Sequence, residues 1–249
     1  MTGRLFLIPT DLGETTSRES FSSRHQAALL SLQHLVAENP KTARRFLKAL
    51  GIPVQQRKID VLDANTQAAD VEKLAALLRS GEDLGLLSEA GCPGIADPGA
   101  ALVALAHRDG QTVIPLVGPC SIVLALMASG LNGQQFAFNG YLPQRSPERE
   151  QLIAEIEARS VRFDQTQIFI ETPYRNAALF QALVATCRPE TLICVASELT
   201  TEREFVSTRS IAQWRKMPPD IDKRPTVFLL NAKPVRSLSR RDSGSGRVQ

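Results

Sequence analysis

The chain has 249 residues, of which 43% are hydrophobic and 22% charged, and these fractions exclude a disordered or collagen-like protein. The formal net charge is +3. Residues 233–249 hold five basic residues and one acidic residue, a local charge of +4, so the rest of the chain carries a net charge of −1. A protein that binds duplex DNA usually has an excess of basic residues on its folded part, so the net charge of residues 1–232 disfavours that function.

Strand and helix patterns alternate through the first half of the chain. Short β-rich apolar runs predict strands, and longer segments with apolar residues at helical spacing predict helices. The predicted strands are 4–9, 33–37, 57–62, 83–88 and 112–116, and the predicted helices are 21–32, 40–50, 68–79, 100–108 and 122–129. This alternation predicts a parallel sheet with helices on both faces.

The second half of the chain has a different pattern, because its last strands are divided only by short connections. Such connections favour antiparallel pairing and therefore a mixed sheet. The predicted strands are 136–140, 167–171, 191–197, 204–208 and 226–231, and the predicted helices are 147–159 and 174–186. We expect two α/β domains, at 1–117 and 118–233, and a disordered basic tail at 234–249.

Three loops that follow strands are candidates for chemistry, because ligands of open α/β sheets bind outside the carboxyl ends of the strands. The loops are 9–13 (PTDLG), 88–99 (SEAGCPGIADPG) and 117–121 (VGPCS). The glycines of the second loop permit close approach of a ligand to the backbone, and Asp97 is placed to cap the next helix. On the residues alone, the favoured interpretation of this loop is a tight structural connection with Asp97 as a plain helix cap.

Several kinds of site are excluded or disfavoured by pattern. The loops contain no nucleoside-triphosphate P-loop, no G-x-G-x-x-G fingerprint and no G-x-S-x-G elbow. His25 and His107 fall on predicted helices and His34 just after one, in the predicted strand 33–37, and for all three a surface or packing role is expected rather than catalysis. The four cysteines form no C-x-x-C pair, so we expect no metal and a reducing, cytoplasmic location. We also expect no signal peptide and no membrane span.

The string SEAGCPGIADPG closely resembles the S-D-A-G-T-P-x-I-S-D-P-G loop of the tetrapyrrole methylase superfamily, and it is most similar to the ribosomal RNA small-subunit methyltransferase I branch. Other segments resemble that branch in the same order along the chain. They are LFLIPTDLG at 5–13, the strand and helix at 35–47, IPLVGPCS at 114–121, GYLP at 140–143, ETPYR at 171–175 (similar to E-S-P-H-R) and ELT at 198–200.

The resemblance implies methyl transfer from S-adenosylmethionine, which the family binds in a cleft between two α/β domains, and it implies a homodimer. Carried over by motif position, the cofactor-binding residues are expected to come from all three loops and from the second domain. They are Pro9, Glu89, Ala90, Gly91, Ile95, Ser121, Ile122, Tyr141, Leu142, Ala196, Leu199 and Thr226.

The chain departs from the family pattern on the acceptor side. The A-E-D-T-R-H-T-R segment appears as AENPKTAR at 37–44, and Tyr174 replaces the His of E-S-P-H-R. Glu38 is the candidate for a base or substrate-orienting acid, and Arg44 the candidate for binding an anionic group; alternatively, Glu38 only caps the helix that Pro40 opens. Arg175 either binds a phosphate or carboxylate in bidentate fashion or forms a surface ion pair.

Three functions stay open at this point. The first is methylation of RNA, similar to ribosomal RNA 2′-O-methylation, for which Arg44, Arg45, Arg145 and Arg175 would supply a positive rim. The second is methylation of a small, tetrapyrrole-like molecule, which requires a cleft wide enough for a macrocycle. The third is a non-catalytic relative that only binds cofactor or a partner.

Overall fold

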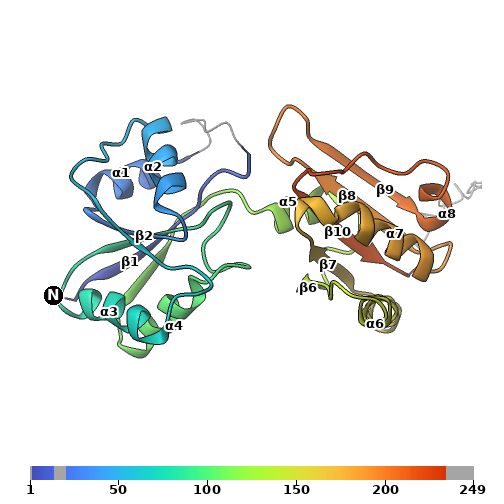
Figure 1. Ribbon diagram of the computed structural model, residues 1–249, viewed down its shortest axis with the longest axis horizontal. Helices are drawn as coiled ribbons and strands as arrows, with labels where there is room; N and C mark the ends of the chain where they lie inside the picture. The colour runs from blue at the N-terminus through green and yellow to red at the C-terminus, as the bar shows by residue number, and fades with distance from the viewer. Residues whose placement is uncertain (1, 14–20, 234–249) are drawn as a thin grey trace, which may run out of the picture.

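The computed structural model describes residues 2–13 and 21–233, so the predicted tail at 234–249 lies outside the described residues. Two lobes lie side by side, each built on a five-stranded sheet (Figure 1). The chain passes from the first sheet to the second between Pro115 and Ser121. We propose 1–117 and 118–233 as the two domains, a division that this crossing supports.

The first lobe is a parallel sheet in the order β3-β2-β4-β1-β5, as predicted. Its strands are β1 (Arg4–Ile8), β2 (His34–Ala37), β3 (Lys58–Val61), β4 (Leu84–Leu87) and β5 (Thr112–Pro115). Its helices are α1 (Ser23–Ser31), α2 (Pro40–Ala49), α3 (Ala68–Arg79) and α4 (Ala100–Arg108). With all strands parallel, their carboxyl ends meet at one edge, and the candidate loops follow from that edge.

Alternate side chains of the first sheet enter two separate cores. On β2, Leu35 packs in the core beneath α1 and α2, whereas Val36 packs in the core beneath α3 and α4. The two helix pairs therefore cover opposite faces, as Figure 1 shows. This burial on both faces accounts for the nearly continuous apolar runs of these strands in the sequence.

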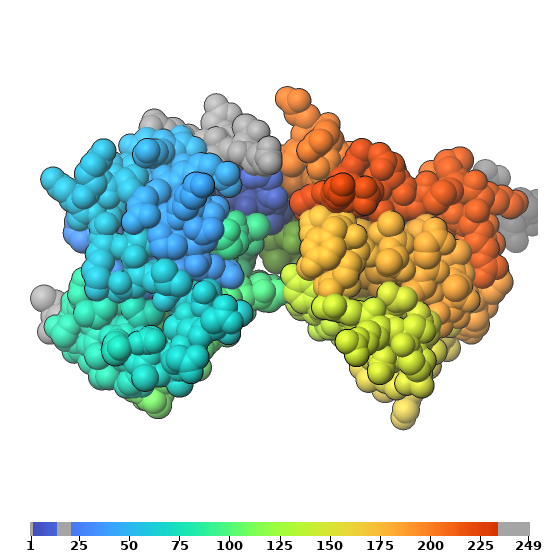
Figure 2. Space-filling model, in the orientation of Figure 1, coloured from blue at the N-terminus to red at the C-terminus, as the bar shows by residue number. Residues whose placement is uncertain are grey.

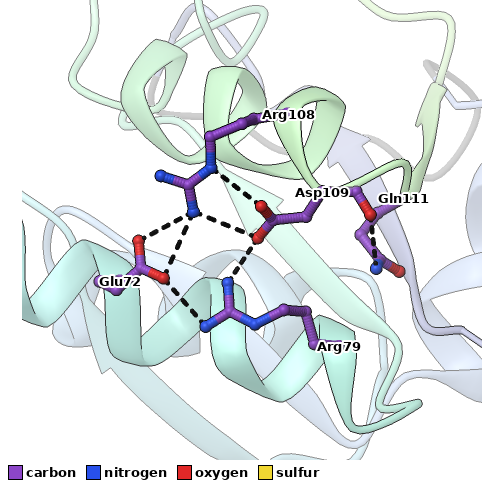
Figure 3. Close-up of polar contacts among 5 residues, drawn as sticks. All are labelled: Glu72, Arg79, Arg108, Asp109 and Gln111. Carbon is purple, nitrogen blue, oxygen red and sulfur yellow. Dashed lines mark hydrogen bonds and ion pairs between the residues drawn. The ribbon is translucent and has the colours of Figure 1, made fainter.

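An ion-pair network joins α3 to α4 at the edge of the sheet opposite the candidate loops (Figure 3). Glu72 contacts Arg79 at 2.9 Å and Arg108 at 3.1 Å, and both arginines also contact Asp109. The paired arginines hold the pKa of the Asp109 carboxyl below its ordinary value. Networks of charges stabilise more than isolated surface pairs do, so this one fixes the two helices on the side remote from the site.

The second lobe is a mixed sheet in the order β6-β7-β10-β8-β9, in which β6 and β7 are parallel and the other neighbouring strands antiparallel. Its strands are β6 (Phe136–Tyr141), β7 (Thr166–Ile170), β8 (Leu192–Ser197), β9 (Phe205–Ser210) and β10 (Thr226–Asn231). The predicted antiparallel pairing of the last strands is confirmed.

The helices of the second lobe divide unequally between the faces of its sheet. Helix α5 (Ser121–Ser129) packs on one face, against residues such as Ile168 and Val227. The other face is covered by α6 (Glu148–Phe163), α7 (Asn176–Thr186) and the short α8 (Ile211–Trp214), around Phe169, Phe228 and Trp214.

The sequence pattern missed two short elements, α8 and the 3-10 turn η2 (Pro173–Arg175), which was predicted as the first turn of α7. Both contain too few residues to show a helical period. Over the described residues, no helix is long and apolar enough to cross a membrane.

Candidate functional site

A cavity of about 360 Å³ lies between the two lobes, at the carboxyl ends of the first sheet's strands. Figure 2 shows the hollow that separates the blue-to-green lobe from the yellow-to-red lobe. Both lobes contribute walls. The lining residues are Leu12, Glu38, Ser88–Cys92, Ile95–Asp97, Cys120–Ile122, Tyr141, Ile170, Glu171, Pro173, Ala196, Leu199 and Pro225–Val227.

The three candidate loops converge at this cavity. The first two are joined by a backbone bridge, in which Thr10 N donates to Gly91 O at 2.9 Å and Gly91 N donates to Thr10 O at 3.3 Å. The third loop lies against both of them. Cys92 Sγ is 3.4 Å from Pro119 O, and a Cβ added to Gly118 would lie only 2.2 Å from Pro9 Cβ. The third loop requires glycine at 118 for this approach.

His25 fixes the first loop from behind. Its ring is fully buried, stacks on Phe21 with centroids 4.3 Å apart, and places Nε2 3.0 Å from Pro9 O. Burial lowers the pKa of His25, so the imidazole is neutral near pH 7, and because a carbonyl can only accept, Nε2 carries the proton. The expected packing role of this histidine is confirmed, and it positions one wall of the cavity.

Asp97 organises the second loop, although it does not cap the following helix in the way we predicted. Its Oδ1 accepts hydrogen bonds from Gly94 N at 2.7 Å and Gly99 N at 2.9 Å. Gly99 is itself the N-cap of α4, and no side chain caps that helix. Burial raises the pKa of Asp97, and its buried Oδ2 has no hydrogen-bond partner among the described residues.

Glu38 lies on the cavity wall and is not a helix cap. Asn39 takes that role, because its Oδ1 accepts from Lys41 N at 2.9 Å at the start of α2. Burial raises the pKa of the Glu38 carboxyl, and the carboxylates of Asp97 and Glu89 raise it further. The alternative in which Glu38 only caps α2 is therefore wrong.

The second lobe supplies an apolar wall with a charged edge. Ala196, Leu199 and Val227 are buried and line the cavity. At the edge, Glu171 Oε1 accepts from Arg175 Nη2 at 2.6 Å and from Arg175 Nε at 3.0 Å. Of the two possibilities for Arg175, the structure shows the ion pair.

Most of the site residues expected from the sequence come together at the cavity. Eleven of the fourteen line it: Glu38, Glu89, Ala90, Gly91, Ile95, Ser121, Ile122, Tyr141, Ala196, Leu199 and Thr226. Whether they bind a cofactor stays a prediction. Three do not line the cavity.

Those three residues have identifiable reasons for lying elsewhere. Leu142 is 3% exposed and packs in the core of the second lobe, because it alternates with Tyr141 and points to the opposite face. Arg44 lies on the exposed side of α2. Pro9 contributes its carbonyl to His25 and its ring to the packing against Gly118.

The sequence reading also missed residues that line the cavity. Glu171 and Pro173 follow β7 directly, and Pro225 precedes β10. The rule that ligands bind beyond strand ends would have found Glu171 and Pro173. Pro225 had no such signal, because β10 runs antiparallel to its neighbours and brings its amino end to the cavity.

The fold has close counterparts among solved structures. The methyltransferase CobJ matches with a TM-score of 0.64 and 20% identical residues, over 92% of this chain and 94% of that one. A uroporphyrin-III C-methyltransferase from Thermus thermophilus, complexed with S-adenosylhomocysteine, matches with a TM-score of 0.56 and 16% identity, over 92% and 97%. The two-sheet architecture with its interlobe cavity is the fold of the tetrapyrrole methylases.

Sequence comparison defines the family more closely. Ribosomal RNA small subunit methyltransferase I of Mycobacterium tuberculosis (strain ATCC 25618 / H37Rv) is 32% identical over 240 residues, which are 95% of this chain and 81% of the relative. The chain belongs to the ribosomal RNA small subunit methyltransferase I family and is a methyltransferase. No protein-family model matches it.

The cavity residues fit S-adenosylmethionine, the methyl donor of this class. A nucleoside requires apolar walls, which the second lobe provides. The cavity volume of about 360 Å³ is at the lower end of the usual range for ligand sites, roughly 300–1,000 Å³, and suits a ligand of this size. The sulfonium and ammonium groups are cationic, and the unpartnered Asp97 Oδ2 and the carboxylates of Glu38 and Glu89 provide a negative field. Among the described residues, no cluster of side chains could hold a metal ion.

We expect Gly91→Val to weaken S-adenosylmethionine binding by about tenfold or more. Gly91 has a φ of +77°, which a β-branched residue adopts only with strain, and the added Cβ would lie 3.0 Å from Leu12 and 3.2 Å from Pro119 O. Calorimetric titration measures the change. Gly133→Val is the matched control, because a Cβ there meets nothing within 4 Å. Unchanged affinity in a folded Gly91→Val protein would contradict this placement.

We also expect bound S-adenosylhomocysteine to protect Cys92 and Cys120, which line the cavity, from alkylation. At about ten times its Kd the ligand leaves roughly a tenth of the protein free, so both rates should fall about tenfold. Burial and the neighbouring Cys120 raise the pKa of Cys92, so the reaction is best followed at alkaline pH. Peptide mapping measures each rate, with the buried Cys187 and Cys194 as internal references. Equal rates with and without ligand would place the ligand elsewhere.

Proposed function

We propose that this methyltransferase transfers the methyl group of S-adenosylmethionine to RNA. The names of its curated relatives support a ribosomal RNA acceptor. The structural observation that carries the proposal is a basic stripe along α2, beside the cavity. We define the α2 stripe as Lys41, Arg44, Arg45 and Lys48.

The spacing of the α2 stripe is i, i+3, i+4 and i+7, so its four side chains share one face of the helix. All four residues are exposed, and none forms an ion pair with another described residue. The helix contains no acidic residue to offset them. Unpaired cations in a row suit a phosphate backbone, whose counterions they displace.

The α2 stripe lies next to the proposed reaction centre. Helix α2 begins two residues after Glu38, which lines the large cavity. Arg45 lines a smaller adjoining cavity of about 80 Å³, which shares Ser88 and Glu89 with the large one. A strand of RNA bound along α2 would therefore pass the mouth of the methyl-donor cavity. In this proposal Arg44 binds phosphate and does not enter the cavity.

The cofactor would bind with its polar groups toward the first lobe. The amino end of α5 has no side-chain cap, and its first residues Ser121 and Ile122 line the cavity, so free amides are available for the methionine carboxylate. Adenine would pack against the apolar wall at Ala196 and Leu199. When bound, S-adenosylmethionine supplies an already activated methyl group, so the protein's main contribution is to align the acceptor.

Glu38 is the residue we assign to the acceptor hydroxyl. A 2′-hydroxyl must lose its proton as it attacks a methyl group, and a positioned carboxylate can accept that proton. Burial and the carboxylates of Asp97 and Glu89 raise the pKa of Glu38, which brings it closer to neutral pH and makes it a better base.

A small tetrapyrrole-like acceptor is the second candidate, favoured by the names of the structural neighbours. The cavity of about 360 Å³ provides room for one nucleoside-sized ligand, and the α2 stripe has no evident role in that case. The non-catalytic alternative is disfavoured by membership of a methyltransferase family.

We also propose a homodimer and a cytoplasmic location. Exposed apolar side chains near the lobe junction support the dimer, because a monomer would leave Val117 and Met127 82% and 74% exposed. Four unpaired cysteines support a reducing compartment.

We expect Glu38→Gln to lower kcat by about 10²–10⁴-fold. The carboxylate is the active form, so the wild-type rate should fall as the pH drops through the raised pKa of Glu38, and the variant should lose this inflection. Methyl transfer from labelled cofactor to cellular RNA measures both effects. Glu155→Gln, at an exposed position on α6, is the control. Wild-type activity and an unchanged pH profile in Glu38→Gln would contradict the assignment.

The α2 stripe predicts the salt dependence of RNA binding. The logarithm of the RNA-binding constant falls as the logarithm of the salt concentration rises. Replacing Lys41 and Lys48 with Gln should make this negative slope shallower by about 0.7 for each lost phosphate contact with single-stranded RNA. Fluorescence anisotropy at several salt concentrations measures it. Arg159→Gln/Arg162→Gln on α6 should leave the slope unchanged. If the wild-type protein bound no RNA at low salt, the RNA acceptor would be excluded.

A further inference from the structure

Both tyrosines of this chain lie exposed at the second-lobe edge of the cavity. Tyr141, at the end of β6, lines the cavity and is 56% exposed. Tyr174 follows β7 in the turn η2 and is 68% exposed. The two strands are parallel neighbours, and Tyr141 pairs with Ile170, so the rings come from adjacent strand ends. The chain is only 5% aromatic, and both its Tyr residues are at one edge.

Tyr174 is connected to the cavity wall through charged contacts. The Arg175 guanidinium lies over the Tyr174 ring, 5.4 Å from its centroid. Arg175 is in turn held by Glu171, whose side chain is 3% exposed and lines the cavity. Glu171 Oε1 also accepts from Thr172 N at 2.7 Å. The buried carboxylate thus fixes the arginine, and the arginine fixes a ring that solvent still reaches.

The backbone beneath Tyr174 is fixed as well. Pro173 begins η2 and lines the cavity, and its carbonyl accepts from Lys223 N at 3.2 Å. An exposed aromatic ring on a rigid support loses little conformational freedom when a ligand stacks on it. Tyr174 therefore presents an exposed ring face on which a flat ligand can stack, and its side chain is not part of the hydrophobic core.

We propose that Tyr174, supported by Arg175, is a stacking subsite for an unpaired nucleobase of the acceptor RNA, beside the nucleotide that enters the cavity. The inference rests on the proposed function, because it assumes an RNA acceptor. Every base has a π-face, so aromatic stacking tolerates sequence and requires a base that is out of a helix. The subsite thus selects loops and single strands, while the α2 stripe on the other lobe binds phosphates.

The test compares four full-length proteins: the wild type, Tyr174→Ala, Tyr174→Phe and Phe163→Ala. Phe163 is a matched control, since it is 53% exposed and has the Arg162 guanidinium 5.0 Å from its ring centroid. Phe163 is the last residue of α6 and lies near the amino end of β7, whereas the cavity lies beyond the carboxyl end of that strand. The probe is a short fluorescein-labelled single-stranded RNA of mixed sequence, read by anisotropy, with the same RNA in a duplex as a second probe.

Stacking predicts a specific pattern of results. Tyr174→Ala should bind the single strand about tenfold more weakly, with an unchanged slope of log K against log salt because no charge is lost. Tyr174→Phe and Phe163→Ala should bind within about twofold of the wild type, because the first keeps its ring and the second is remote. Duplex binding and S-adenosylmethionine affinity should be the same in all four proteins.

Each contrary outcome has a separate meaning. If the wild type bound no RNA, the proposed function would fail and the subsite with it. Wild-type RNA binding that Tyr174→Ala leaves intact would overturn the subsite alone. An equal loss in Tyr174→Phe would assign the effect to the hydroxyl and overturn stacking. Loss of cofactor affinity in Tyr174→Ala would make the residue structural, which also overturns the inference.

Discussion

The backbone bridge between Thr10 and Gly91 is the constraint on which the site depends. It joins the loops that leave β1 and β4, which are adjacent strands, and so fixes the floor of the cavity to the middle of the parallel sheet. The third loop approaches this bridge closely because Gly118 has no side chain. The neutral ring of His25 holds the first loop from behind. Backbone geometry therefore shapes the cavity floor, and side chains contribute mainly its charge.

Charge is divided between the inside and the outside of the site. Inside, Glu38, Glu89 and Asp97 crowd one wall, and burial, together with the neighbouring carboxylates, keeps the pKa of Glu38 raised. Outside, the α2 stripe begins only a few residues away and is entirely cationic. Under the proposed function, a cationic methyl donor in the cavity and an anionic RNA along the α2 stripe would each contact a surface of opposite charge. The same stretch of chain, from Glu38 through α2, provides both surfaces because it crosses from the cavity to the exterior.

The sequence predicted the sheets, most helix bounds and the convergence of loops, because strand ends and glycines follow local rules. It placed Glu38 on the site but left open a capping role, which only the observed Asn39 cap removes. Leu142 was misplaced although strand alternation with Tyr141 would have turned it toward the core. Arg44 was expected in the site, yet the helical phase of α2 points it outward. The role of Pro225 depends on a contact between distant segments, in which Glu198 N donates to Pro225 O, and periodicity does not report such contacts.

The position of β10 affects the order in which the protein can assemble during synthesis. This strand is the last of its sheet in sequence but lies between β7 and β8. Before it emerges from the ribosome, the sheet consists of a parallel pair, β6 and β7, and a separate hairpin, β8 and β9. Thr226 and Val227 of β10 also line the cavity. A nascent chain therefore cannot complete the wall of this cavity until the final strand inserts.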